Sequence, residues 1–230
     1  MDIDLQILSA EESWEHQVSV YKNYHQKYAQ FYSPDKFFYH PYLQSKFSEP
    51  GLSPNELKNI KGYFVSKIYD KKKLEQGKQF ISQQVVSFIE EKNNRLQELP
   101  ITHPDFLTIK LSGAMSGGFY DAVKHSITNS PQCVSPNFMP LLLVHEITHI
   151  CVDNEIQKRK LPHLAKERIV SRICSEILEF DDHNSVDDKS LDKFLSKENL
   201  SSDFLGTLNS IADYLNINQT QAQMHTSRTK

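Results

Sequence analysis

Cysteine is scarce in this sequence, since the 230 residues include only Cys133, Cys151 and Cys174. The number is odd, the three are far apart, and no C-x-x-C pair occurs. These features exclude a disulfide framework and a thiolate zinc knuckle. Secreted scaffolds often depend on such frameworks, so a reducing compartment is expected.

Positive charge and long apolar runs are also lacking. Lysine and arginine number 26 against 29 acidic residues, and the formal net charge is -3. A nucleic-acid surface needs a strongly basic face, so nucleic acid is not an expected partner. The longest apolar run, "FMPLLLV" at 138–144, is far shorter than the ~20 residues that span a bilayer. No membrane partner is expected either.

An export signal is missing from the N-terminus, "MDIDLQILSAEESWEH". Acids stand where a secretory signal needs a basic region followed by an apolar one. We therefore expect a soluble, cytoplasmic protein, either in the cell that makes it or in a cell that receives it. The oligomeric state is left open by these features.

Glycine is infrequent, at 7 residues, while hydrophobic residues make up 38% of the chain. This composition is typical of a helix-leaning globular protein, long enough for one sizeable core, or for a core with a modest accessory subdomain. Four segments are expected: a helical region at 1–100, a mixed core at 101–183, closing helices at 184–217 and a flexible tail at 218–230.

The helical region has a clear internal start signal. Residues 1–50 are rich in aromatics and read as a helix followed by irregular packing that covers the core. Ser53, Pro54 and Glu56 then form a capping signature. It opens two expected helices with a break near Lys71–Gly77.

Strand signals begin after Pro100. "FLTIKLSG" at 106–113 alternates apolar and polar residues, which predicts a half-buried strand. A glycine-containing turn leads to "FYDAVKHSITNS" at 119–130, a second strand candidate. Pro140 suits the first turn of a helix that follows.

This expected helix carries "LLLVHEITHICVDN" at 141–154. Side chains step by about 100° around a helix, which places Glu146 about 100° and His149 about 40° from His145. All three share one face, while Leu143 and Ile147 lie away from the histidines. We expect the apolar face in a core and the polar face in a cleft.

Two imidazoles at i and i+4 can bind one divalent ion at ~2.0–2.1 Å. The pattern is H-E-x-x-H, in which the intervening glutamate acts as the base that takes a proton from a metal-activated water. His145 and His149 are therefore candidate zinc ligands, and Glu146 is the candidate catalytic residue.

Catalytic zinc usually has a third protein ligand. Glu155 stands where the metzincin arrangement has its third ligand, but Val152 replaces the glycine that this arrangement needs. Asp153 lies on the ligand face of the same helix. Glu167 and Glu176 lie on the next expected helix, 163–180, about 180° apart around its axis. Angles alone do not choose between these two glutamates.

The "HEITH" motif, the strands before it and "KERIVSR" after it resemble the gluzincin branch of the zincin metallopeptidases. The resemblance covers about residues 106–180. It implies an α+β, mostly helical fold with a short sheet whose edge strand borders the active-site helix. It further implies His145, His149 and Glu167 as Zn²⁺ ligands, Glu146 as general base, and Glu176 as the alternative third ligand.

The resemblance also implies a protein or peptide substrate that pairs with the edge strand. The corresponding residues are Phe119, Tyr120, Asp121, Ala122 and Val123. Thermolysin-like members have an asparagine and an aspartate where this chain has Lys166 and Ser171, so no subfamily is assigned.

A zinc-dependent metallopeptidase is the function that these observations favour. The oxyanion-stabilising residue is open among His163, His183, Tyr120 and Tyr214. Two other hypotheses remain: a catalytically inactive or regulatory zincin-like binding protein, and a helical interaction module without metal. Metal content separates the last from the other two, and peptide turnover separates the first two.

Overall fold

The computed structural model describes residues 1–114, 118–180 and 188–227, with the backbone alone for 217–227. The chain divides into two compact units, each made of two segments. The first unit comprises Met1–Glu90 and Pro104–Ile147, and the second comprises Glu91–His103 and Thr148–Lys230. The fold is α+β, as predicted.

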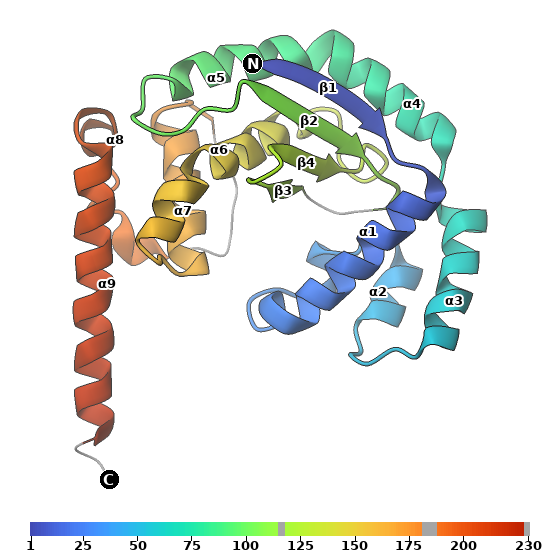
Figure 1. The fold of residues 1–230 in the computed structure, drawn as a ribbon, viewed down its shortest axis with the longest axis horizontal. Coiled ribbons are helices and arrows are strands. Elements are labelled where there is room, and N and C mark those ends of the chain that lie inside the picture. The colour runs from blue at the N-terminus through green and yellow to red at the C-terminus, as the bar shows by residue number, and fades with distance from the viewer. Residues whose placement is uncertain (115–117, 181–187, 228–230) are drawn as a thin grey trace. The chain divides into compact units, whose positions relative to one another are not determined.

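A four-stranded sheet lies in the first unit (Figure 1). Its strands are β1 (Asp2–Ile7), β2 (Phe106–Leu111), β3 (Phe119–Asp121) and β4 (Ser126–Asn129), in the order β1-β2-β4-β3. The first, second and fourth strands are parallel, and β3 runs antiparallel to β4. Within the described residues, β3 is therefore an edge strand.

Strand β2 confirms the prediction for 106–113, but it is more buried than a half-buried strand. It lies between two parallel neighbours, and Leu107, Ile109 and Leu111 are fully buried. Parallel strands are usually covered on both faces, which accounts for this burial. β1 was not predicted, because its segment was assigned to a helical region.

The second strand candidate, 119–130, is a hairpin rather than one strand. Strands β3 and β4 are joined by a turn in which the Lys124 amide donates to Asp121 Oδ1 at 3.0 Å. His125 has a φ of 45°, the left-handed conformation that a turn requires. Ala122 and Val123 consequently lie in the turn and not in the strand, with Val123 92% exposed.

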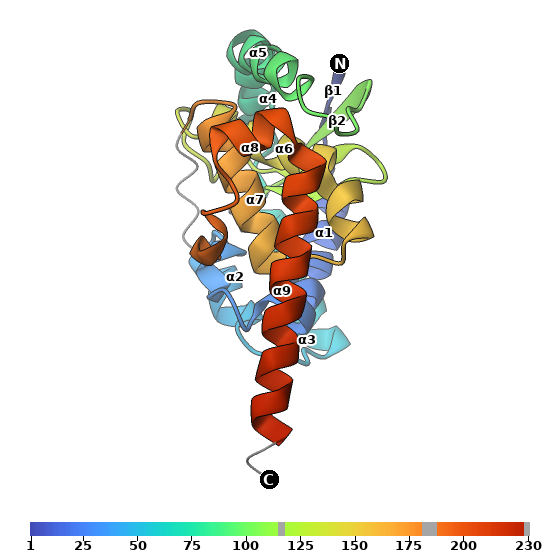
Figure 2. The ribbon, with the colours of Figure 1, turned by 90° about the vertical axis from the view of Figure 1, so that its left-hand side faces the viewer.

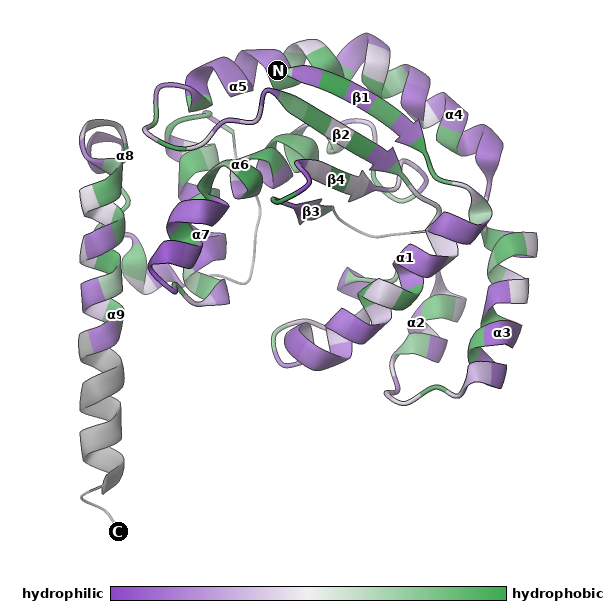
Figure 3. Ribbon diagram, in the orientation of Figure 1, coloured by the Kyte–Doolittle hydropathy of each residue, from purple (hydrophilic) through white to green (hydrophobic). Residues whose placement is uncertain are grey.

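Helices occupy most of the remaining first unit. They are α1 (Ala10–Asn23), α2 (Pro41–Phe47), α3 (Pro54–Tyr63), α4 (Lys71–Phe80) and α5 (Val86–Leu96), which continues into the second unit. One-turn π-helices, Tyr24–Tyr28, Phe64–Ile68 and Ile81–Val85, follow α1, α3 and α4, and Pro34–Lys36 is a 3-10 turn. Helix α4 packs against β1 and is mostly hydrophilic, whereas β1 alternates in hydropathy (Figure 3).

The predicted capping box at the start of α3 is confirmed. Ser53 Oγ accepts from the Glu56 amide, and the Glu56 carboxylate accepts from the Ser53 amide at 2.8 Å. The same arrangement of Ser9 and Glu12 opens α1. The break between helices falls at Tyr69–Asp70, immediately before the predicted position.

The aromatic N-terminal region, which was predicted to cover the core, forms a buried cluster together with Phe64. Its buried rings are Trp14, Tyr21, Tyr24, Phe37, Phe38, Phe47 and Phe64. Their tilted and edge-to-face contacts, with centroids 4.9–6.1 Å apart, are the geometry that aromatic pairs prefer. These contacts pack α1 against α2 and against the π-helical turn that follows α3.

Helix α6 (Met139–Lys158) begins one residue before Pro140, and the boundary between the units lies within it. The second unit also contains α7 (His163–Glu176), the 3-10 turn Lys189–Leu191, α8 (Lys197–Ser202) and α9 (Phe204–Ser227). Helix α8 leads directly into α9 (Figure 2). Helix α9 continues to Ser227, past the predicted start of the tail at 218.

No helix among the described residues has the length and apolar character needed to cross a membrane.

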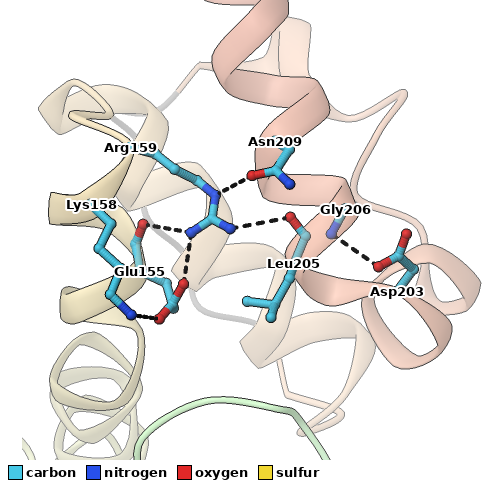
Figure 4. Close-up of polar contacts among 7 residues, drawn as sticks. All are labelled: Glu155, Lys158, Arg159, Asp203, Leu205, Gly206 and Asn209. Atoms are coloured by element: carbon cyan, nitrogen blue, oxygen red, sulfur yellow. Dashed lines mark hydrogen bonds and ion pairs between the residues drawn. The ribbon is translucent and has the colours of Figure 1, made fainter.

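Arg159, near the end of α6, joins this helix to α9 (Figure 4). Its Nε donates to Asn209 Oδ1 at 2.7 Å, and its Nη1 donates to Glu155 Oε2 at 2.7 Å. A guanidinium that forms several geometrically matched bonds is well suited to join two elements. The C-terminal half of α6 is therefore held within the second unit.

His16 on α1 is a titratable group placed against the sheet. Its ring lies edge-on to Phe119, with centroids 5.8 Å apart, and its Nε2 is buried. Burial lowers the pKa of His16 to about 4, and the Lys110 charge acts in the same direction. The imidazole is consequently neutral in the folded protein at neutral pH.

We predict that His16 makes the protein less stable at acidic pH. In the unfolded chain it binds a proton below about pH 6.5, whereas in the folded chain it does so only below about 4. This contribution to the free energy of unfolding is constant above about pH 6.5, falls as the pH drops from 6.5 to 4, and totals about 3 kcal/mol. Urea unfolding of the wild type and His16→Phe at several pH values measures it. Equal pH dependence of the two proteins would contradict the prediction.

Candidate metal centre

Helix α6 presents His145 and His149 one turn apart. Pro140 in the first turn starts the helix, and Leu142, Leu143 and Val144 are buried before the motif. The side chains of the polar face, for which a cleft was expected, are buried. His145, Glu146 and His149 are only 8%, 7% and 3% exposed.

Helix α7 supplies the third member of the group. Ile169, Val170 and Ile173 are fully buried and orient the helix, with Glu167 only 7% exposed. Glu167 Oε2 lies 3.4 Å from His149 Nε2. The glutamate that the gluzincin resemblance implied is therefore beside a predicted histidine ligand.

The potential ligand atoms of His145, His149 and Glu167 all lie within 4.8 Å of one another. Two ligands at ~2.0–2.1 Å from a tetrahedral zinc ion would be about 3.3 Å apart. The 3.4 Å between His149 Nε2 and Glu167 Oε2 matches this separation. Because the other ligand atoms lie within 4.8 Å of one another, small side-chain movements would bring them to the same separation. Two imidazoles and one carboxylate are also a donor set of catalytic zinc sites. The residues fit a zinc ion.

Two further polar groups surround the Glu167 carboxylate. His163 Nδ1 and Lys166 Nζ each lie 3.5 Å from Glu167 Oε1. Burial lowers the pKa of His163, the Glu167 charge opposes that shift, and Lys166 adds to it. Such groups orient a ligating carboxylate and reduce the cost of burying it.

Glu146 lies outside the ligand group, as a general base should. Its side chain approaches the chain just before β3, so a methyl group at Gly118 would lie 2.6 Å from Glu146 Cγ and 2.8 Å from Oε1. The sequence did not single out Gly118, which was assigned to a turn and to the start of the edge strand. Nothing in the local sequence indicates this tertiary contact.

The alternative third ligands are not members of this group. Glu176 forms an ion pair with Arg172 at 2.8 Å and is not in the group. Glu155 pairs with Lys158 and Arg159 at 2.6 and 2.7 Å (Figure 4). Asp153 is not a member of the group either, and Val152 is fully buried. The structure thus brings Glu167 to the histidines.

The oxyanion candidates come from different elements of the chain. His163 contacts Glu167, whereas Tyr120 is a half-buried residue of β3. The Tyr214 ring lies 3.7 Å from Lys193 Nζ. His183 lies outside the described residues. Ser171 is buried at 7% exposure on α7.

Comparison of the chain with family models, curated proteins and solved structures gives no match. The interpretation of this site therefore depends on its geometry and on the motif itself.

We predict that Glu167→Ala weakens zinc binding on the order of 100-fold or more, because it removes one of three ligands from a buried site. Glu176→Ala is the matched control on the same helix, and it should leave zinc affinity unchanged while losing only a surface ion pair. Titration of both variants with a competing chelator measures the two affinities. Zinc loss from Glu176→Ala alone would reverse the assignment.

A companion prediction concerns the histidines. The His145→Ala, His149→Ala double variant should contain no stoichiometric zinc after purification, because a single carboxylate cannot retain the ion. Elemental analysis of the folded protein, with folding checked by circular dichroism, measures this. Full zinc occupancy would rule out this metal site.

Proposed function

We propose that this chain is a zinc-dependent metallopeptidase that hydrolyses peptide bonds in a protein or peptide substrate. The observation that carries the proposal is the approach of Glu167 to His145 and His149, with Glu146 adjacent but outside the group. This is the division of roles that hydrolysis requires: three residues bind the metal, and one remains available to move protons.

His145, His149 and Glu167 would hold the ion. A bound zinc ion supplies Lewis acidity, polarising a carbonyl oxygen and making a water more acidic. The contacts of Glu167 with His163 and Lys166 keep the carboxylate oriented toward His149. The protein thereby provides a preformed set of donors.

Glu146 performs the proton transfers. Its carboxylate accepts a proton from the attacking water and then donates it to the departing amine of the cleaved peptide bond. Because Glu146 is 7% exposed, its interaction with a reacting group is little screened by solvent. A buried general base is effective only if its position relative to the reacting groups is well defined.

Strand β3 is the proposed site of substrate pairing. One edge of β3 pairs with β4 through Phe119, Tyr120 and Asp121, and β3 is last in the described sheet. An extended peptide could add to the other edge through main-chain hydrogen bonds. Ala122 and Val123 would then flank the peptide from the turn, without pairing with it.

The burial of the centre favours one second candidate, a catalytically inactive or regulatory zincin-like binding protein. Each of the four residues is at most 8% exposed, whereas catalysis requires that a peptide reach Glu146. A third candidate, a helical interaction module, would contain no metal. Metal analysis separates the third candidate from the others, and peptide turnover separates the first two.

We predict that Glu146→Gln retains zinc and folds normally but loses turnover by ~10²–10⁴-fold, the usual contribution of positioned proton transfer. The assay is mass spectrometry of an unbiased peptide library incubated with the zinc-loaded protein. Glu155→Gln on the same helix is the control and should keep wild-type turnover, since Glu155 pairs with Arg159. Undiminished turnover by Glu146→Gln would exclude Glu146 from the mechanism.

A further inference from the structure

Gly118 is the residue immediately before β3, and its α-carbon faces the Glu146 side chain. A Cβ at this position would lie 2.6 Å from Glu146 Cγ, 2.8 Å from Oε1 and 2.9 Å from Cδ. Its three nearest neighbours are thus all atoms of Glu146. Nonbonded carbon atoms in proteins keep about 3.5–4.0 Å apart, so a methyl group does not fit beside this conformation of Glu146.

The backbone conformation does not explain the glycine. The φ of Gly118 is outside the left-handed region, in contrast to Gly51 with a φ of 83°. An alanine could adopt the backbone of Gly118 without the strain that left-handed residues impose. The requirement for glycine at 118 therefore comes from the space that Glu146 occupies.

Glu146 has little freedom to move aside. It is 7% exposed, and the contact involves Cγ and Cδ as well as the terminal oxygen. Relief of the overlap would require a different rotamer, because α6 holds the backbone of Glu146. A new rotamer would carry the carboxylate away from its present position.

We infer that Gly118 is a positioning residue for Glu146: the missing side chain leaves the space that holds the carboxylate in one place beside the start of β3. This inference deepens the proposed function and rests on it for its catalytic meaning. A substrate peptide paired with β3 would lie along the strand that starts directly after Gly118. Gly118 would thus link the substrate strand to the reacting group.

A double-mutant cycle in thermal stability tests the contact without reference to activity. Gly118→Ala should lower the Tm by roughly 2–10 °C through overpacking. In a Glu146→Ala background the same substitution should change the Tm by less than about 1 °C. Gly62→Ala is the control, since nothing lies within 4 Å of its Cβ position, and it should not lower the Tm in either background.

A second measurement tests positioning itself. Crystal structures of the wild type and Gly118→Ala should show the Glu146 carboxylate displaced, with His145, His149 and Glu167 unmoved. Zinc affinity should accordingly stay within about threefold of the wild type, as expected for a residue that is not a ligand. With a cleavable peptide, kcat should fall on the order of 100-fold at unchanged KM.

Equal Tm shifts in the two backgrounds, or an unmoved carboxylate, would overturn the inference. If Gly118→Ala does not fold, restored folding in the Glu146→Ala background supports the contact and failure to restore it refutes the contact. If the wild type cleaves no peptide, the peptidase proposal fails, while the Tm cycle and the carboxylate position still decide the role of Gly118.

Discussion

The burial of ionisable side chains on α6 and α7 is the constraint on which the candidate site depends. A carboxylate and two imidazoles at 3–8% exposure lose most of their hydration, which costs several kcal/mol per charge unless partners replace the water. The contacts of Glu167 with His149, His163 and Lys166, at 3.4–3.5 Å, supply part of that replacement. Buried ion pairs alone often contribute little net stability, and a divalent ion would offset the remaining cost.

The surrounding elements serve to keep these groups in place. Apolar residues bury both helices along the faces beside the ligands, and Arg159 joins the end of α6 to Asn209 of α9. Side chains in such close-packed surroundings have few alternative rotamers. A three-residue donor set can therefore be preformed before any ion binds, which reduces the ordering that binding requires.

Local signals in the sequence predicted several helices, including the one that carries the two histidines. Pro140 and the apolar spacing indicated α6, and the Ser53–Glu56 pair indicated the start of α3. β1 escaped prediction because it carries Asp2 and Asp4, residues that are uncommon in strands, and because its strand state depends on pairing with the distant β2. The hairpin turn escaped because His125, rather than glycine or asparagine, adopts the left-handed conformation.

The position of Glu167 is more informative than the motif that suggested it. Any helix containing "HEITH" places its two histidines on one face, so their proximity follows from helix geometry alone. The rotation of α7 follows instead from its apolar stripe, which could equally have turned Glu176 inward. The structure pairs Glu176 with Arg172 and turns Glu167 toward His149. Residues of two helices thus meet at one point, which is the arrangement that the proposed metal site needs.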